Sequence, residues 1–147
     1  MLRVCDVMAS SPVSCAPTST LCEAAKAMLM TDCGSLPVVD GDSTQLVGII
    51  TDRDIAIRGC AAGQDPNSTA VSVVMSHPVV SVVSDSPLED CLKLMEANQI
   101  RRAPVVDHNG QLVGIVAQAD IALKTSQEVS GELVKQISKE ASVGLPS

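Results

Sequence analysis

Two short segments of this sequence carry side chains that could bind a small molecule. The first is Gly48-Ile49-Ile50-Thr51-Asp52-Arg53-Asp54, in which a hydroxyl precedes a carboxylate by three residues. On a helix this spacing puts both groups on the same side. An ionised carboxylate accepts two hydrogen bonds from a ribose diol, but a hydroxyl and a carboxylate at a helix start also form a simple cap. Thr51 and Asp54 are therefore candidates for ribose binding or for a structural cap.

The second segment has the same outline with one group missing. It reads Gly114-Ile115-Val116-Ala117-Gln118-Ala119-Asp120, so the carboxylate is kept and an alanine replaces the hydroxyl of Thr51. Gly48 and Gly114 hold matching positions, where the lack of a side chain would let a ligand approach the backbone closely. One lost hydrogen bond costs about 0.5 to 1.5 kcal/mol, which is about 2- to 12-fold in Kd. We expect the first segment to form the tighter site.

A pair of arginines could supply positive charge to such a ligand. Arg101 and Arg102 precede the second of two matching strands, and Gly34-Ser35 stands in that place before the first. A guanidinium suits phosphate, although an adjacent arginine pair is equally an ordinary solvated edge. Arg53 is a further candidate. The formal net charge is −7, and nucleic-acid binding depends on basic residues, so we expect no nucleic-acid partner.

The sequence offers no evident catalytic or metal-binding set. His77 and His108 have no acid or cysteine partner at a suggestive spacing, and no nucleophile stands beside a general base. Six cysteines show neither a C-x-x-C pair nor zinc-like spacing, so buried free thiols are the simplest interpretation. They are Cys5, Cys15, Cys22, Cys33, Cys60 and Cys91. We therefore predict no catalytic residue, no metal ligand and no enzyme activity.

The composition limits how a ligand could be held. The chain has 147 residues and no Phe, Tyr or Trp. Stacking of bases on aromatic side chains is thereby ruled out, and a purine would have to lie between aliphatic side chains and backbone. No stretch approaches the roughly 18 apolar residues of a membrane span, and the N-terminus lacks the pattern of a signal peptide. We expect a cytoplasmic protein with no membrane partner.

The elements that position these groups occur twice. Pro37-Val38-Val39-Asp40 recurs 67 residues later as Pro104-Val105-Val106-Asp107, and the run 45–49 recurs as 111–115, 66 residues later. Such ordered matches indicate a duplicated unit. We predict the order β-α-β-β-α in each copy. The expected strands are 13–15, 36–39 and 46–50, then 79–83, 103–106 and 112–116. The expected short helices are 52–58 and 118–124.

Helix starts and boundaries follow from local signals. Thr20 with Glu23, and Ser86 with Glu89, have the spacing of capping boxes that begin a longer helix in each copy. Residues 59–70 have the composition of a linker, and residues 125–140 are spaced as an amphipathic helix. We divide the chain into repeat 1 with the start of the linker (1–66), repeat 2 (67–124) and a C-terminal helix and tail (125–147). A unit of about 60 residues is too small to bury a comfortable core, so the copies should pack together, and the module should form a homodimer.

At this point the residues resemble a known family, the tandem cystathionine β-synthase (CBS) domains. The resemblance rests on the two Pro-Val-Val-Asp runs and on the pattern of Gly48, Thr51 and Asp54, and it covers roughly residues 4–124. The stretch 51–55 with 65–67 is similar to the small stand-alone bacterial members. The second copy keeps the glycine and the aspartate but loses the threonine.

The resemblance implies an α/β (α+β) fold in which two repeats pack with pseudo-twofold symmetry and leave two clefts. It implies an adenosine-containing ligand such as AMP, ADP, ATP, S-adenosylmethionine or an NAD-type molecule, no required cofactor, and phosphate contacts from basic residues such as Arg101 and Arg102. The implied function is a non-enzymatic sensor that signals to a separate protein effector. The alternative is a redox- or metal-responsive interaction protein that uses its free thiols and binds no nucleotide.

Overall fold

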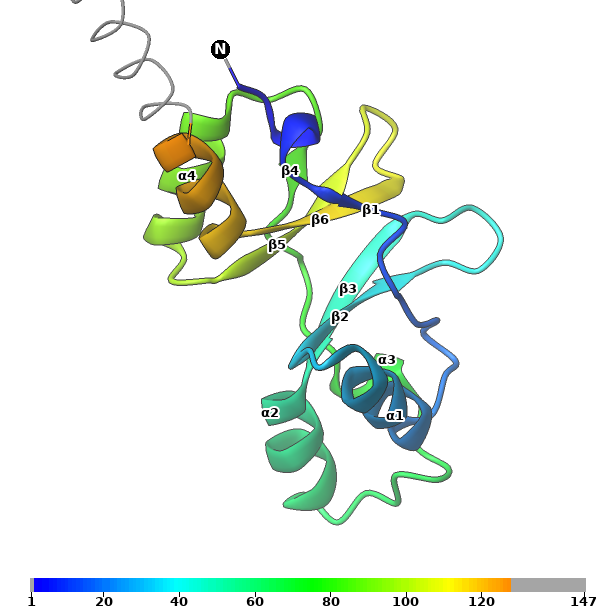
Figure 1. The fold of residues 1–147 in the computed structure, drawn as a ribbon. Helices are drawn as coiled ribbons and strands as arrows, with labels where there is room; N and C mark the ends of the chain where they lie inside the picture. The colour runs from blue at the N-terminus through cyan, green and yellow to red at the C-terminus, as the bar shows by residue number, and fades with distance from the viewer. Residues whose placement is uncertain (1, 128–147) are drawn as a thin grey trace, which may run out of the picture.

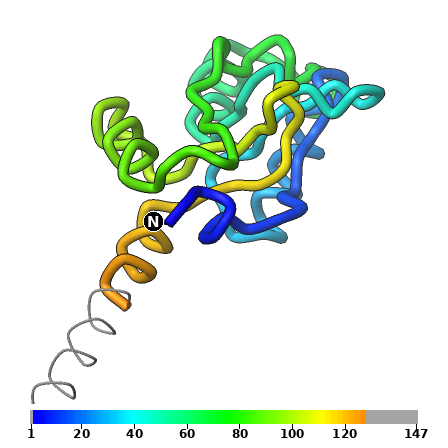
Figure 2. The backbone as a smooth tube through the Cα atoms, turned by 90° about the horizontal axis from the view of Figure 1, so that it is seen from above, coloured from blue at the N-terminus to red at the C-terminus, as the bar shows by residue number. Residues whose placement is uncertain are grey.

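The two sequence repeats fold as two lobes with matching elements (Figure 1). A computed structural model describes residues 2–127. The first lobe contains α1 (Leu21–Thr31), β2 (Ser35–Val39), β3 (Leu46–Thr51), α2 (Asp52–Asp54) and the π-helix η2 (Ile55–Cys60). The second contains β4 (Val82–Val83), α4 (Leu88–Ala97), β5 (Arg102–Val106), β6 (Leu112–Ala117) and a helix over residues 118–127. Figure 2 shows that last helix running outward from its lobe.

The strands pair in the same way in both lobes. β2 pairs with β3 and β5 with β6, both antiparallel, and β4 lies parallel to β5. In the first lobe, the place of β4 is taken by one parallel bridge from Cys15 to Val38. Consecutive residues Leu36, Pro37 and Val38 are all buried, as expected for a strand that is covered on both faces. The mixed fold and the pseudo-twofold arrangement predicted from the repeat are confirmed.

The short segments that lead into the repeats are exchanged between the lobes. The 3₁₀ turn η1 (Val4–Asp6) and β1 (Ala9–Ser10) belong to repeat 1, yet β1 pairs with β6 and Val4 is fully buried in the second core (Figure 1). The matching turn α3 (Val71–Val74) packs in the first core, where Val71 and Val74 are buried. Each core is therefore completed by the chain that precedes the other repeat.

Backbone hydrogen bonds hold each exchanged segment at a helix start. Leu88 N–H donates to the carbonyl of Leu2, and Leu21 N–H donates to the carbonyl of Thr69, both at 3.0 Å. The cap expected at Thr20 is confirmed, because its hydroxyl accepts from Glu23 N–H at 3.1 Å. The capping box expected at Ser86 is wrong: Pro87 is the N-cap of α4, with no side-chain cap. There the incoming chain supplies the acceptor at Leu88.

A reciprocal pair of glutamines joins the two hairpin loops. Gln45 Nε2 donates to the carbonyl of Asn109 at 2.7 Å, and Gln111 Nε2 donates to the carbonyl of Ser43 at 2.9 Å. Two backbone bonds lie beside them, of which Leu46 N–H to the carbonyl of Gly110 is one. The glutamine that opens each repeated run thus has a structural role, because its side chain binds the hairpin loop of the other lobe.

Several expected elements differ in extent. The strand over 79–83 is reduced to β4, because only Val82 and Val83 pair with β5. The short helix over 52–58 continues to Cys60 as a π-helix. The linker is docked rather than free, since Thr69 is buried and the carbonyl of Pro66 accepts from Cys22 N–H at 2.9 Å. The amphipathic helix expected over 125–140 lies outside the described residues from 128 onward.

Candidate functional site

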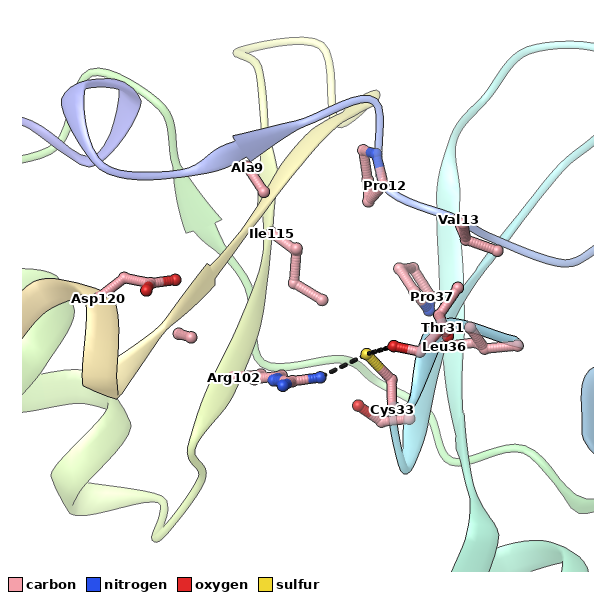
Figure 3. A pocket seen from close by; sticks show the side chains of 12 residues that line it. Ala9, Pro12, Val13, Thr31, Cys33, Leu36, Pro37, Arg102, Ile115 and Asp120 are labelled. Atoms are coloured by element: carbon pink, nitrogen blue, oxygen red, sulfur yellow. Dashed lines mark hydrogen bonds between the residues drawn. The ribbon is translucent and has the colours of Figure 1, made fainter. Parts of the chain in front are cut away.

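A cavity of about 220 Å³ lies between the lobes and contains one of the predicted aspartates (Figure 3). Its polar lining includes Asp120 and Arg102 from the second lobe and Cys33 from the first. We call it the Asp120 cleft. Its apolar lining comes from both lobes and from the exchanged segment. These residues are Ala9, Pro12, Val13, Leu36, Pro37, Ile115 and Ala117.

The charged groups of the Asp120 cleft lie at different parts of its wall. Asp120 is in the first turn of the helix over 118–127, and Arg102 opens β5. Arg102 Nη1 donates to Cys33 Sγ at 2.6 Å, so the guanidinium reaches across to the first lobe (Figure 3). A carboxylate, a guanidinium and an aliphatic wall are the groups that would bind a ribose, a phosphate and a base.

A second cavity, of about 600 Å³, contains the predicted threonine. We call it the Thr51 cleft. Arg101 and Arg102 line it together with Arg53, so the structure brings all three candidate arginines to one place. Two carboxylates, of Asp32 and Asp52, line the same cavity. The guanidinium groups outnumber the carboxylates there, in a chain whose net charge is negative.

Thr51 and Asp54 form a capping box with each other. Asp54 N–H donates to Thr51 Oγ1 at 3.0 Å, and Thr51 N–H donates to Asp54 Oδ2 at 3.1 Å. Asp54 is half-buried and lines neither cleft, whereas Thr51 lines the cleft named after it. Thr51 and Asp54 therefore form the structural cap that the sequence allowed, and one carboxylate oxygen of Asp54 accepts a hydrogen bond at the start of its own helix.

Thr51→Ala is expected to lower the free energy of unfolding by about 1 kcal/mol, because it removes an N-cap acceptor. Thr20→Ala removes the same kind of cap from α1, away from both clefts, and should cost a similar amount. Urea denaturation measures both losses, and calorimetry with adenosine should give the same Kd for both variants in the Asp120 cleft. A tenfold weaker Kd for Thr51→Ala alone, in the cleft that Thr51 lines, would instead give that hydroxyl a role in ligand binding.

Gly48 and Gly114 face protein rather than an open cavity. A Cβ at Gly48 would lie 2.6 Å from Met75 Sδ, and one at Gly114 would lie 2.6 Å from Met8 Sδ and 2.9 Å from the carbonyl oxygen of Ala9. Neither glycine lines either cleft. The structure therefore gives a reason for glycine other than the ligand approach inferred from sequence, namely the close passage of the exchanged segments over β3 and β6.

The expectation that His108 has no acid partner is wrong. His108 Nε2 lies 2.8 Å from Asp85 Oδ2, a pairing that the sequence separation conceals. This hydrogen bond lowers the pKa of the exposed Asp85 carboxyl below its usual value. The pair lies at the surface and lines neither cleft.

The thiols differ in how far they are exposed. Burial raises the pKa of Cys15 to about 11 and also raises the pKa of Cys91, so neither forms a thiolate near neutral pH. Cys5 and Cys60 are exposed, and Cys33 lines the Asp120 cleft. Within residues 2–127, no three His, Cys, Asp or Glu side chains are grouped so that they could hold a metal ion.

Sequence reasoning found the charged groups of the Asp120 cleft but missed several others that line it. Cys33 directly precedes Gly34-Ser35, the counterpart of Arg101-Arg102, and this alignment was the signal that could have pointed to it. Val13 and Pro37 carry no such signal, because their place in the cleft depends on how the lobes meet.

Comparison with known proteins identifies the family. The model of the CBS domain matches residues 4–58 and again residues 71–125. The chain belongs to the CBS domain family. The CBS domain-containing protein YhcV of Bacillus subtilis is 43% identical to it over 141 residues, which cover 95% of this chain and 98% of the relative. The tandem pair predicted from the repeat is confirmed.

Solved structures of other CBS proteins have the same fold. The crystal structure of hypoxic response protein I with two coordinated zinc ions is 37% identical, covers 82% of this chain and 97% of its own, and has a TM-score of 0.74. The CBS domain pair of protein MJ0100, in complex with 5′-methylthioadenosine and S-adenosyl-L-methionine, is 30% identical. It covers 87% of this chain and 98% of its own, with a TM-score of 0.73. In the described part of this CBS pair, no helix has the length and apolarity needed to cross a membrane.

Proposed function

We propose that this CBS pair is a non-enzymatic regulatory module that binds an adenosine-containing ligand in the Asp120 cleft. The observation that carries the proposal is the position of Asp120 and Arg102 around one cavity with an aliphatic wall. The MJ0100 pair, which has the same fold, is in complex with two adenosine compounds. No cofactor is required for this function, and the adenosine compound acts as the signal.

Each group in the Asp120 cleft has a role in this proposal. The Asp120 carboxylate accepts hydrogen bonds from the ribose hydroxyls, and Val13, Pro37 and Ile115 contact the adenine in place of aromatic rings. The cavity of about 220 Å³ is smaller than the roughly 300 to 1,000 Å³ of common ligand sites. The rest of a phosphorylated ligand would therefore extend from the cavity, where the Arg102 guanidinium binds its phosphate.

We propose the opposite order of ligand affinity in the two clefts from the one inferred from sequence. The loss of a hydroxyl at Ala117 predicted that the Asp120 cleft would be the weaker one. Asp54, however, lines neither cleft, and its carboxylate caps its own helix. A carboxylate that faces a cavity can bind ligand without loss of a cap, so we assign the tighter site to Asp120.

The signal would reach other proteins through the relation of the two lobes. A ligand that contacts both lobes favours one arrangement of them over others, and a separate protein effector would read that change.

Two adjacent exposed side chains on α1, Leu29 and Met30, are 82% and 86% exposed and support the predicted homodimer. The cytoplasmic location stays a prediction from sequence.

A thermal-shift series with adenosine, 5′-methylthioadenosine and AMP tests the proposed function. At 100 times its Kd, a ligand should stabilise the folded chain by about 2.7 kcal/mol. Arg102→Ala should weaken AMP more than adenosine, and Lys26→Ala, which removes an exposed charge from α1 outside both clefts, should change neither. The absence of both a thermal shift and calorimetric heat with all three compounds would contradict the function.

A further inference from the structure

One charged side chain lines both clefts between the lobes. Arg102 forms part of the wall of the Asp120 cleft and of the Thr51 cleft. It is exposed, it opens β5, and its Nη1 reaches Cys33 Sγ of the first lobe at 2.6 Å. A guanidinium in this position can approach a phosphate from either side.

The pseudo-twofold partner of Arg102 cannot perform the same task. Ser35 opens β2 as Arg102 opens β5, and in the paired strands Ser35 faces Thr51 as Arg102 faces Ala117. Ser35 also lines both clefts. A symmetric module would place one cation at each of these positions, but this chain has a hydroxyl at one of them. At this pair of positions the two clefts therefore share a single positive charge.

We propose that Arg102 is the shared phosphate-binding residue of both clefts, so that a phosphorylated ligand in one cleft weakens phosphate binding in the other. This inference rests on the proposed function, because it requires ligands with and without phosphate in the clefts. A guanidinium that forms a bidentate hydrogen bond with a first phosphate has fewer free N–H donors and less uncompensated positive charge for a second phosphate. The two phosphates also repel each other. The uncharged part of the ligand is unaffected.

The remaining charges make this coupling unequal between the clefts. The Thr51 cleft has Arg53 and Arg101 besides the shared residue, and the carboxylates of Asp32 and Asp52 oppose them. In the Asp120 cleft, Arg102 is the cationic lining residue. A phosphate there depends on Arg102 alone, so we expect the Asp120 cleft to lose more phosphate affinity when the other cleft is filled.

Calorimetry of the full chain with adenosine and with AMP tests this coupling. The measured quantity is the ratio of the second Kd to the first for each ligand. Coupling between sites commonly amounts to about 5- to 150-fold, and the exposed position of Arg102 favours the lower end. We expect the ratio for AMP to exceed the ratio for adenosine by about fivefold, and the excess to shrink at high salt.

Two variants distinguish coupling through the shared charge of Arg102 from two independent clefts that differ in their affinity for AMP. Arg102→Ala should lower the AMP ratio toward the adenosine ratio, with a remainder from Arg53 and Arg101, which stay in the Thr51 cleft. Ser35→Arg, which supplies the missing cation, should lower the AMP ratio while leaving adenosine unchanged. Lys26→Ala serves as the control for loss of one positive charge.

The outcomes distinguish the inference from the function on which it rests. Adenosine binding in both clefts with equal ratios for the two ligands would overturn the shared role of Arg102 and leave the proposed function standing, as would adenosine binding in one cleft only. If neither adenosine nor AMP binds, the proposed function itself fails, and the inference fails with it.

Discussion

A chain that ends at residue 66 is expected to be unfolded, whereas residues 11–76 should form a more ordered lobe. The first core includes Val71 and Val74, which the shorter fragment lacks and the second fragment retains. Burial of one valine contributes about 1.5 to 3 kcal/mol, and a domain of this size has about 5 to 15 kcal/mol in total. Circular dichroism and thermal melting of the two fragments measure the difference.

The two fragments have the same length, so size alone does not separate them. Residues 11–76 also retain the bridge between Ile49 and Ser76 and the bond from Leu21 N–H to Thr69, and they omit Val4, which serves the second core. A cooperative melt for residues 1–66 would contradict both the exchange and the need for two repeats.

Asp120→Ala is expected to weaken adenosine binding by about tenfold or more. Hydrogen bonds to a charged group contribute about 1.5 to 3 kcal/mol, and Asp120 is the carboxylate that lines the Asp120 cleft. Asp54→Ala should leave the tighter Kd unchanged and lower the free energy of unfolding by about 1 kcal/mol, because it removes one half of a capping box. Calorimetry and urea denaturation of both variants measure the two effects.

The same two variants, Asp120→Ala and Asp54→Ala, also test which cleft binds adenosine more tightly. If Asp54→Ala abolished tight binding and Asp120→Ala left it intact, the order inferred from the threonine in the sequence would be the correct one. Asp42→Ala, at an exposed position in the turn between β2 and β3, is a control for loss of a carboxylate.

Most of the architecture could be predicted from the duplicated sequence. Two ordered copies with the same apolar runs predict the same strands twice, and Thr20 marks the start of α1. The exchange could not be predicted, because Val4 and Val71 are equivalent in sequence and nothing local says which core each one enters. The cap at Ser86 failed for a different reason: α4 begins at Leu88, so Pro87, whose side chain has no acceptor, stands at the cap position that Thr20 holds before α1.

The candidate site could be predicted in its charges but not in its shape. Asp120 and Arg102 stood out by residue type and by their places in the two repeats. Their assignment to one cavity depends on the packing of the lobes, as does the presence of Cys33 beside Arg102. The use of the Asp54 carboxylate by its own helix is a local geometric fact that residue types leave open, because ribose binding and capping need the same spacing.

The exchange of the leading segments also sets an order of events during synthesis. The first core lacks its last valine until residue 74 has been made, and the second lacks its last part until Ile121 has been made. Val4 is made well before the residues of the second core that bury it, which extend from Val82 to Ile121. Because chains emerge from the N-terminus and contacts between distant residues form slowly, the segment that contains Val4 and β1 stays unpaired until the second repeat has been made. The first lobe can therefore be completed before the second, and the segment that precedes the first lobe is buried after it.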